Sequence, residues 1–232
     1  MLSSKSIILT MLLLIISAVN LSATDCIENH PSEWLEMISE GTVDSSGYSL
    51  EYAIACTYVG ALMNLQYNPE FLTSDEELNK IYERNEKIKE EIYAIIPQYL
   101  ISPIPEVRCN AAQALAFYRW PDSFSYLMAC ERNVTDLSLL VILGDQRAIP
   151  LIIEKYKNIR MTKATSSMPT KSLIEDAARC VEALYHFASP EILPFINSVI
   201  NSSAEEPIQV MARKVCGRIH DLYPNTERPV DK

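Results

Sequence analysis

The chain has 232 residues, of which 48% are hydrophobic and 22% charged, with 13 prolines and 5 glycines. This is the composition of a globular protein. The 30 acidic residues outnumber the 20 basic ones, and the net charge of −10 disfavours nucleic-acid binding because an acidic surface repels phosphate. Three histidines leave little material for a histidine-rich metal site, and five glycines disfavour glycine-rich phosphate loops.

Residues 1–23 have the three parts of a secretory signal peptide. Lys5 supplies the positive charge, an apolar run extends from Ile7 to Val19, and a small residue, Ala23, precedes the expected cleavage point. The run is too short for a membrane-spanning helix, which needs about 20 apolar residues. We therefore expect an exported protein, periplasmic or secreted, with no integral membrane segment after cleavage.

Residues 24–104 predict helices that are divergent repeats or a cap. Apolar residues follow helical spacing in Pro31–Glu40, in Tyr48–Tyr67 and again after Ser74. Ser74 and Glu77 form a capping-box pattern, in which the serine oxygen accepts backbone N–H groups and the glutamate reaches back. Prolines from Pro97 onward interrupt the third helix because proline lacks the amide donor.

From Pro105 onward the sequence repeats itself. Residues 105–130 align without a gap on residues 174–199, at a shift of 69 residues, and a shift of 25 aligns a third unit around Leu140. Each unit consists of an apolar helix, a tight turn and a second helix, and the first helix of the unit at Asn133 is shortened. This pattern predicts repeated helix pairs over residues 105–223, followed by a tail over 224–232.

Two segments depart from the three complete units. Residues 159–170 are rich in Ser, Thr and Met and predict a surface loop inserted between units. Residues 210–215 resemble the first helix of a fourth, partial unit.

The central unit carries a family resemblance. Residues 143–153, with the sequence LGDQRAIPLII, resemble the inter-helix signature of HEAT-like repeats of the phycobilisome-lyase type, and residues 107–115 are similar to the opening of the first helix of that repeat. The resemblance implies an all-α fold, an α-solenoid of antiparallel helix pairs. Gly144 can end one helix in the left-handed conformation, and Asp145 can cap the next helix through its carboxylate.

The six cysteines all follow the signal peptide, and an even number in an exported chain suggests disulfides. Buried thiols are the alternative, since free cysteine is often a core residue. Residues 109 and 130 lie about equally far from the turn near Trp120, and residues 180 and 216 lie near equivalent positions of successive helices. The suggested pairs are Cys109 with Cys130, Cys180 with Cys216, and Cys26 with Cys56.

Candidate catalytic residues are few. His186 lies on an apolar helix face, which is typical of a core or rim histidine. His220 lies near a helix C-terminus, where a cation is favourable. His30 has no partners for a metal site beyond Cys26. The adjacent carboxylates belong to polar helix faces or a loop: Glu76 and Glu77, Glu90 and Glu91, Glu205 and Glu206. Asn133 and Asn201 match glycosylation sequons, which matter only in a eukaryotic source.

The sequence thus favours a non-catalytic protein, without cofactor or metal, that binds another protein through the face of a solenoid. An inhibitor or immunity-type protein and an assembly scaffold both fit, and the acidic charge favours a basic partner. The alternative is an extracytoplasmic enzyme that acts on sugars or peptidoglycan through an acidic groove with paired carboxylates.

Overall fold

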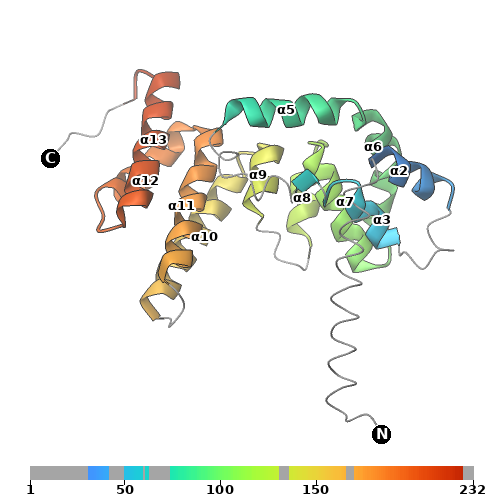
Figure 1. Ribbon diagram of the computed structural model, residues 1–232, viewed down its shortest axis with the longest axis horizontal. Helices are drawn as coiled ribbons and strands as arrows, with labels where there is room; N and C mark the ends of the chain where they lie inside the picture. Colours follow the sequence, from blue (N-terminus) through green and yellow to red (C-terminus); the bar gives the residue numbers. More distant parts are fainter. Residues whose placement is uncertain are drawn as a thin grey trace, which may run out of the picture.

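A computed structural model describes residues 31–41, 50–59, 61–62, 74–130, 136–165 and 170–226. All regular elements in these ranges are helices, which confirms the all-α prediction (Figure 1). The predicted signal peptide, Cys26, His30 and Asn133 lie outside the described residues.

The helices divide into an N-terminal group and a repeat region. The N-terminal group consists of α2 (Pro31–Ser39), α3 (Leu50–Cys56), α5 (Asp75–Glu86), α6 (Lys89–Ile95) and the 3-10 helix η3 (Pro97–Ile101). The repeat region consists of α7 (Pro105–Phe117), α8 (Ser123–Met128), α9 (Leu137–Leu143), α10 (Ala148–Thr165), α11 (Thr170–Phe187), the 3-10 helix η4 (Pro190–Ile192), α12 (Leu193–Ile200) and α13 (Glu206–Leu222).

Five helices pack in a row that follows the chain. Helix α3 contacts α7, α7 contacts α9, α9 contacts α11, and α11 contacts α13. Helices α8, α10 and α12 lie between these in sequence, and each packs on at least one of them. The small residues of α7 permit close approach, since Ala111, Ala112 and Ala114 are all fully buried. The order of contacts therefore follows the repeat order read from the sequence.

Helix α5 runs along this row, over the ends of its helices (Figure 1). The hydroxyl of Tyr82 donates to the Ile142 carbonyl in the last turn of α9, at 3.2 Å. The side-chain amide of Asn85 donates to the Phe117 carbonyl at the end of α7, at 3.0 Å. The last carbonyls of a helix have no partner within the helix. Helix α5 supplies donors to two of these helix ends.

The two ends of the α5–α6 segment also contact helices of the repeat region. At the start of α5, Asp75 accepts two hydrogen bonds from Arg218 of α13, at 2.7 and 3.0 Å. In α6, the Tyr93 hydroxyl donates to the carbonyl of Tyr118, the C-cap residue of α7, at 2.9 Å. The segment thus bridges the row from α7 to α13.

Three residues with positive φ end the first helices of the three complete units. Gly144 is the C-cap residue of α9, with a φ of +67°. Arg119 has a φ of +58° and Ala188 a φ of +40°. They lie 25 residues before and 44 residues after Gly144, which are the spacings of the sequence repeat. The backbone conformation at this position is therefore the same in all three units, although the side chains differ.

Two predicted helices are interrupted by turns in the structure. Helix α3 ends at Cys56 and turns at Thr57, whose hydroxyl donates to the Ile54 carbonyl at 2.7 Å, a side-chain bond that competes with the helical backbone. The helix predicted after Ser74 divides into α5 and α6 by a turn at Lys87 and Ile88. The predicted loop is also wrong in part, because α10 continues through Thr165. Helix α10 can continue this far because its Glu, Lys, Arg and Met residues are good helix formers and it contains no Gly.

The capping residues take local roles at helix ends. The Ser74 oxygen accepts the Glu77 amide at 3.2 Å at the start of α5, while the Glu77 carboxylate pairs with Lys80 at 3.0 Å rather than reaching back. The Asp145 carboxylate accepts the Arg147 amide at 2.9 Å just before α10, and it also binds the Arg147 guanidinium. The guanidinium holds the pKa of the Asp145 carboxyl below its usual value.

Candidate functional site

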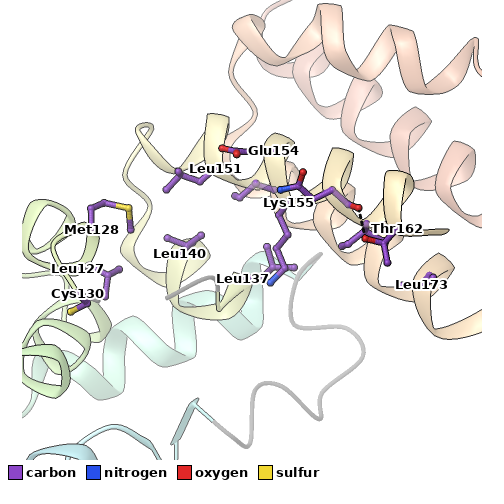
Figure 2. A pocket seen from close by; sticks show the side chains of 13 residues that line it. Leu127, Met128, Cys130, Leu137, Leu140, Leu151, Glu154, Lys155, Thr162 and Leu173 are labelled. Atoms are coloured by element: carbon purple, nitrogen blue, oxygen red, sulfur yellow. Dashed lines mark hydrogen bonds between the residues drawn. The ribbon is translucent and has the colours of Figure 1, made fainter. Parts of the chain in front are cut away.

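A pocket of about 510 Å³ lies among α8, α9, α10 and the start of α11 (Figure 2). The lining is mostly aliphatic: Leu127, Met128, Cys130, Leu137, Leu140, Leu151, Ile152, Ile159 and Leu173. Its polar members all belong to α10: Glu154, Lys155, Asn158 and Thr162. Such a volume and such a lining are typical of ligand pockets in proteins.

The pocket exists because α10 is much longer than its counterpart in the preceding unit. Helix α8 has 6 residues and α10 has 18. Helix α10 packs along α11, and its lining residues, which run from Leu151 to Thr162, share the pocket with Leu127 and Met128 of α8. Side chains three or four residues apart share one helix face, so Leu151, Lys155 and Thr162 line one side of the pocket together.

The polar side chains divide the pocket into a rim and an inner part. Glu154, Asn158 and Thr162 are exposed, and the Thr162 hydroxyl donates to the Asn158 carbonyl at 2.9 Å (Figure 2). Lys155 is half-buried, and its positive charge acts on the buried thiol of Cys180 in α11. Burial raises the pKa of Cys180 to about 11, and Lys155 opposes this increase. Lys155 is thus the least exposed of the four polar lining residues.

Cys109 and Cys130 lie together at the α8 end of the pocket. The two thiols are near enough for Cys109 to influence the pKa of Cys130. Cys109 is buried in α7, and Cys130 follows α8 and is half-buried. The Cys130 thiol also donates to the Tyr126 carbonyl at 3.6 Å. Burial, with the Cys109 contact next, raises the pKa of Cys130 to about 12.

The structure corrects two of the three suggested disulfide pairs, whereas Cys56 is disulfide-bonded. Cys109, Cys130, Cys180 and Cys216 are all free cysteines. The first two make the contact expected across the helix pair, but without a bond. Cys180 and Cys216 are buried in α11 and α13, where they behave as core thiols, and burial alone raises the pKa of Cys216. The suggested bridge to Cys56 involves Cys26, which lies outside the described residues.

A second polar cluster joins α5, α11 and α13. His186 Nδ1 lies 3.5 Å from Asp75 Oδ1, and the imidazole is almost fully buried. The Arg218 guanidinium binds the same carboxylate and lies 4.3 Å from the centre of the Tyr185 ring. The cluster holds the first turn of α5 on the ends of two helices, which is a structural role.

The remaining candidates are dispersed. His220 lies in the last turn of α13, where its Nδ1 is 2.9 Å from the Thr226 hydroxyl. Asn201 is exposed at the end of α12. The carboxylate pairs are divided among polar faces: Glu76 and Glu77 with Lys80, exposed Glu90 and Glu91, and Glu205 with Arg160.

Sequence reasoning did not identify the pocket, because its aliphatic residues have the same spacing as core residues. Leu140, Leu151 and Ile152 were recognisable only as repeat positions. The available signal was the unequal length of the second helices: no proline follows Pro150 until Pro169, whereas α8 stops six residues after it begins.

The described residues hold no group of three or more His, Cys, Asp or Glu side chains that could bind a metal ion. Within the same ranges, every helix is too short or too polar to cross a membrane. No protein-family model, curated protein or solved structure matches the chain.

Proposed function

We propose that this chain is an exported HEAT-like α-solenoid that binds a basic protein partner through the pocket between α8 and α10. The observation that supports the proposal most directly is the mostly aliphatic pocket of about 510 Å³ with polar side chains at its rim. An apolar anchor residue that enters such a pocket, surrounded by polar contacts, is the usual centre of a protein–protein interface.

The solenoid part of the proposal is supported by two independent repeats. The row of α3, α7, α9, α11 and α13 places each helix against its next counterpart, as in stacked repeat proteins. The positive φ at Arg119, Gly144 and Ala188 recurs at the spacings of the sequence repeat.

Charge indicates the chemistry of the partner. The net charge of −10 attracts a basic protein and accelerates the encounter. At the pocket itself, Glu154 is exposed on the rim beside the aliphatic lining. A partner segment with an aliphatic or aromatic anchor next to Lys or Arg would fill the pocket and pair with this carboxylate.

A photo-crosslinking amino acid placed at two neighbouring positions of α10 tests the proposal. Thr162 lines the pocket, whereas Met161 is exposed and is not part of the lining. We expect the derivative at 162, in the extract of the source organism, to crosslink one protein in stoichiometric yield, and the derivative at 161 not to. That protein, purified, should bind 1:1 with an affinity that falls as salt rises.

Met128→Glu and Met161→Glu form the matched variants for this binding measurement. Both residues are exposed methionines, and only Met128 lines the pocket. A buried charge at the pocket should weaken binding at least tenfold, and the change at 161 should have little effect. Equal affinities for the two variants would exclude the pocket as the binding site.

The enzyme alternative depends on a pair of carboxylates. General acid and base catalysis on sugars needs two carboxyl groups about 5–9.5 Å apart. Of the described residues that line the pocket, Glu154 is the one carboxylate. Turnover of peptidoglycan fragments that is lost in Glu154→Gln would favour this alternative over the binding function.

Export is tested separately. Cleavage after Ala23 leaves Thr24 as the first residue, so the protein recovered from outside the cytoplasm should have an intact mass that begins at Thr24. A cytoplasmic protein that retains residues 1–23 would contradict the proposed export.

A further inference from the structure

We propose that the pocket between α8 and α10 also binds a small straight-chain carboxylate of the fatty-acid type, with Lys155 as the partner of its head group. Two observations carry this inference: the aliphatic lining of a pocket of about 510 Å³, and one half-buried lysine among the lining residues. The inference goes beyond the proposed function, because such a ligand would bind without any protein partner.

The lining of the pocket suits a hydrocarbon chain. Nine of its thirteen residues are Leu, Ile, Met or Cys, and Leu140 and Leu151 lie between Lys155 and Met128 of α8 (Figure 2). The volume falls within the range of small-molecule pockets, roughly 300–1,000 Å³. Each methylene that leaves water for such a lining strengthens binding about fourfold. We therefore place the chain along the leucines, from Lys155 toward α8.

Lys155 selects the charge of the head group. Among the described residues that line the pocket it is the one cation, and its half-buried side chain lies between Leu140 and Leu151 on one side and Leu173 on the other (Figure 2). An ammonium group has three hydrogen-bond donors, so it can bind a ligand carboxylate beside a contact within the protein. A charge-assisted bond of this kind is short and strong. The head group should therefore be anionic and lie at Lys155.

The local charge of α10 favours an anion, although the whole chain is acidic. At physiological salt, exposed charges further away than about 8 Å are largely screened. Helix α10 carries four basic residues and one acidic residue, and the basic excess remains when Arg160 is paired with Glu205. The acidic residue, Glu154, is exposed at the rim, where water weakens its repulsion of a carboxylate.

Calorimetric titration of the mature full-length protein with two amphiphiles tests the site. Decanoate and decyltrimethylammonium, each below its micelle concentration, have similar chains and head groups of opposite charge. We expect decanoate to bind 1:1 and at least about tenfold more tightly than the cation. Octanoate should bind roughly tenfold more weakly than decanoate, because two methylenes are lost.

Lys155→Met and Lys157→Met are the matched variants. Both lysines belong to α10, but Lys157 is exposed and is not part of the lining. Lys155→Met should weaken decanoate binding at least about tenfold and should not weaken binding of decyltrimethylammonium, which shows that the pocket is still folded. Lys157→Met should change either affinity by less than about twofold. Lys155→Arg, which keeps the positive charge, should retain most of the decanoate affinity.

Three results would overturn the inference: no decanoate binding at millimolar concentration, equal affinities for the two head groups, or equal losses in the two methionine variants. The crosslinking experiment at position 162 separates this inference from the proposed function. A crosslinked protein without decanoate binding would overturn the ligand site and leave the protein partner in place. Decanoate binding without a crosslinked protein would support the ligand site and count against the partner.

Discussion

Ala188 ends α11 with a φ of +40°, a conformation that costs a residue with a Cβ about 1 kcal/mol and costs glycine little. Ala188→Gly should therefore raise the free energy of unfolding by about 0.5–1 kcal/mol. Urea denaturation of the two proteins measures the difference. The substitution leaves the helix itself intact, because Ala188 lies one residue beyond α11.

Alanine substitutions at Gly144 and Gly217 are the controls, and we expect them to change the stability in opposite directions. Gly144→Ala should destabilise the protein by about 1 kcal/mol, because Gly144 has a φ of +67° although its surroundings leave room for a Cβ. Gly217 lies within α13 with open space around it and no positive φ, so Gly217→Ala should stabilise by about 0.5–1 kcal/mol. A loss of stability in Ala188→Gly would contradict the backbone argument.

Glu182 gives a pH-dependent prediction. Burial raises the pKa of this carboxyl in α11, against the opposing charges of Arg179 and Lys214. A raised pKa in the folded state means that stability is highest below the ordinary carboxyl pKa and decreases as pH rises through the raised value. Glu182→Gln should therefore be more stable than the wild type at pH 7, and the difference should disappear near pH 3. A variant that is less stable at pH 7 would contradict the assigned cause.

Helix α5 depends on single side chains that satisfy the ends of other helices. Asn85→Ala removes the donor to the buried Phe117 carbonyl, and an unsatisfied buried acceptor costs about 1–3 kcal/mol. We expect that loss of unfolding free energy in urea denaturation. Glu83→Ala, an exposed change two residues away in the same helix, should stay within about 0.5 kcal/mol of the wild type.

Local patterns in the sequence predicted the individual helices well, and contacts between distant segments explain where they failed. Trp34, Leu35 and Ile38 are the buried face of α2, as their spacing indicated. By contrast, Asn85 looks like an ordinary polar-face residue and Tyr82 like a member of the apolar face, and the sequence pattern does not indicate their bonds to carbonyls 32 and 60 residues away. The division between α5 and α6 is also invisible in the local pattern, because apolar residues continue at helical spacing through the turn at Lys87 and Ile88.

The candidate site shows the same limit in another form. The contact of Cys109 with Cys130 followed from the helix-pair register, since both lie at similar distances from the turn. The pocket did not, because a leucine beside an empty volume and a leucine in a packed core have the same sequence pattern. The difference lies in the lengths of neighbouring helices, and residues 159–165 were interpreted as a loop instead of the extension of α10.

Asp75 and Arg218 join the N-terminal helix group to α13, the last described helix of the repeat region. Asp75→Asn and Arg218→Gln, alone and combined, should show a coupling free energy of about 0.5–1 kcal/mol, modest because Asp75 is more than half exposed. The exposed pair of Glu76 and Lys80 within α5 is the matched control and should couple measurably less than Asp75 and Arg218. Equal coupling in both pairs would contradict a special role for the contact between α5 and α13.

The same contact sets an order of events during synthesis. Arg218 follows Asp75 by 143 residues, and at about 5–20 residues per second the ribosome needs roughly 7–30 s to add them. During that interval α7 and α9 are completed one after the other and can pack on α5. The first turn of α5 still lacks its partner in α13. The nascent chain therefore reaches its final arrangement only after α13 has left the ribosome, so the first turn of α5 acquires its place long after its own residues have been made.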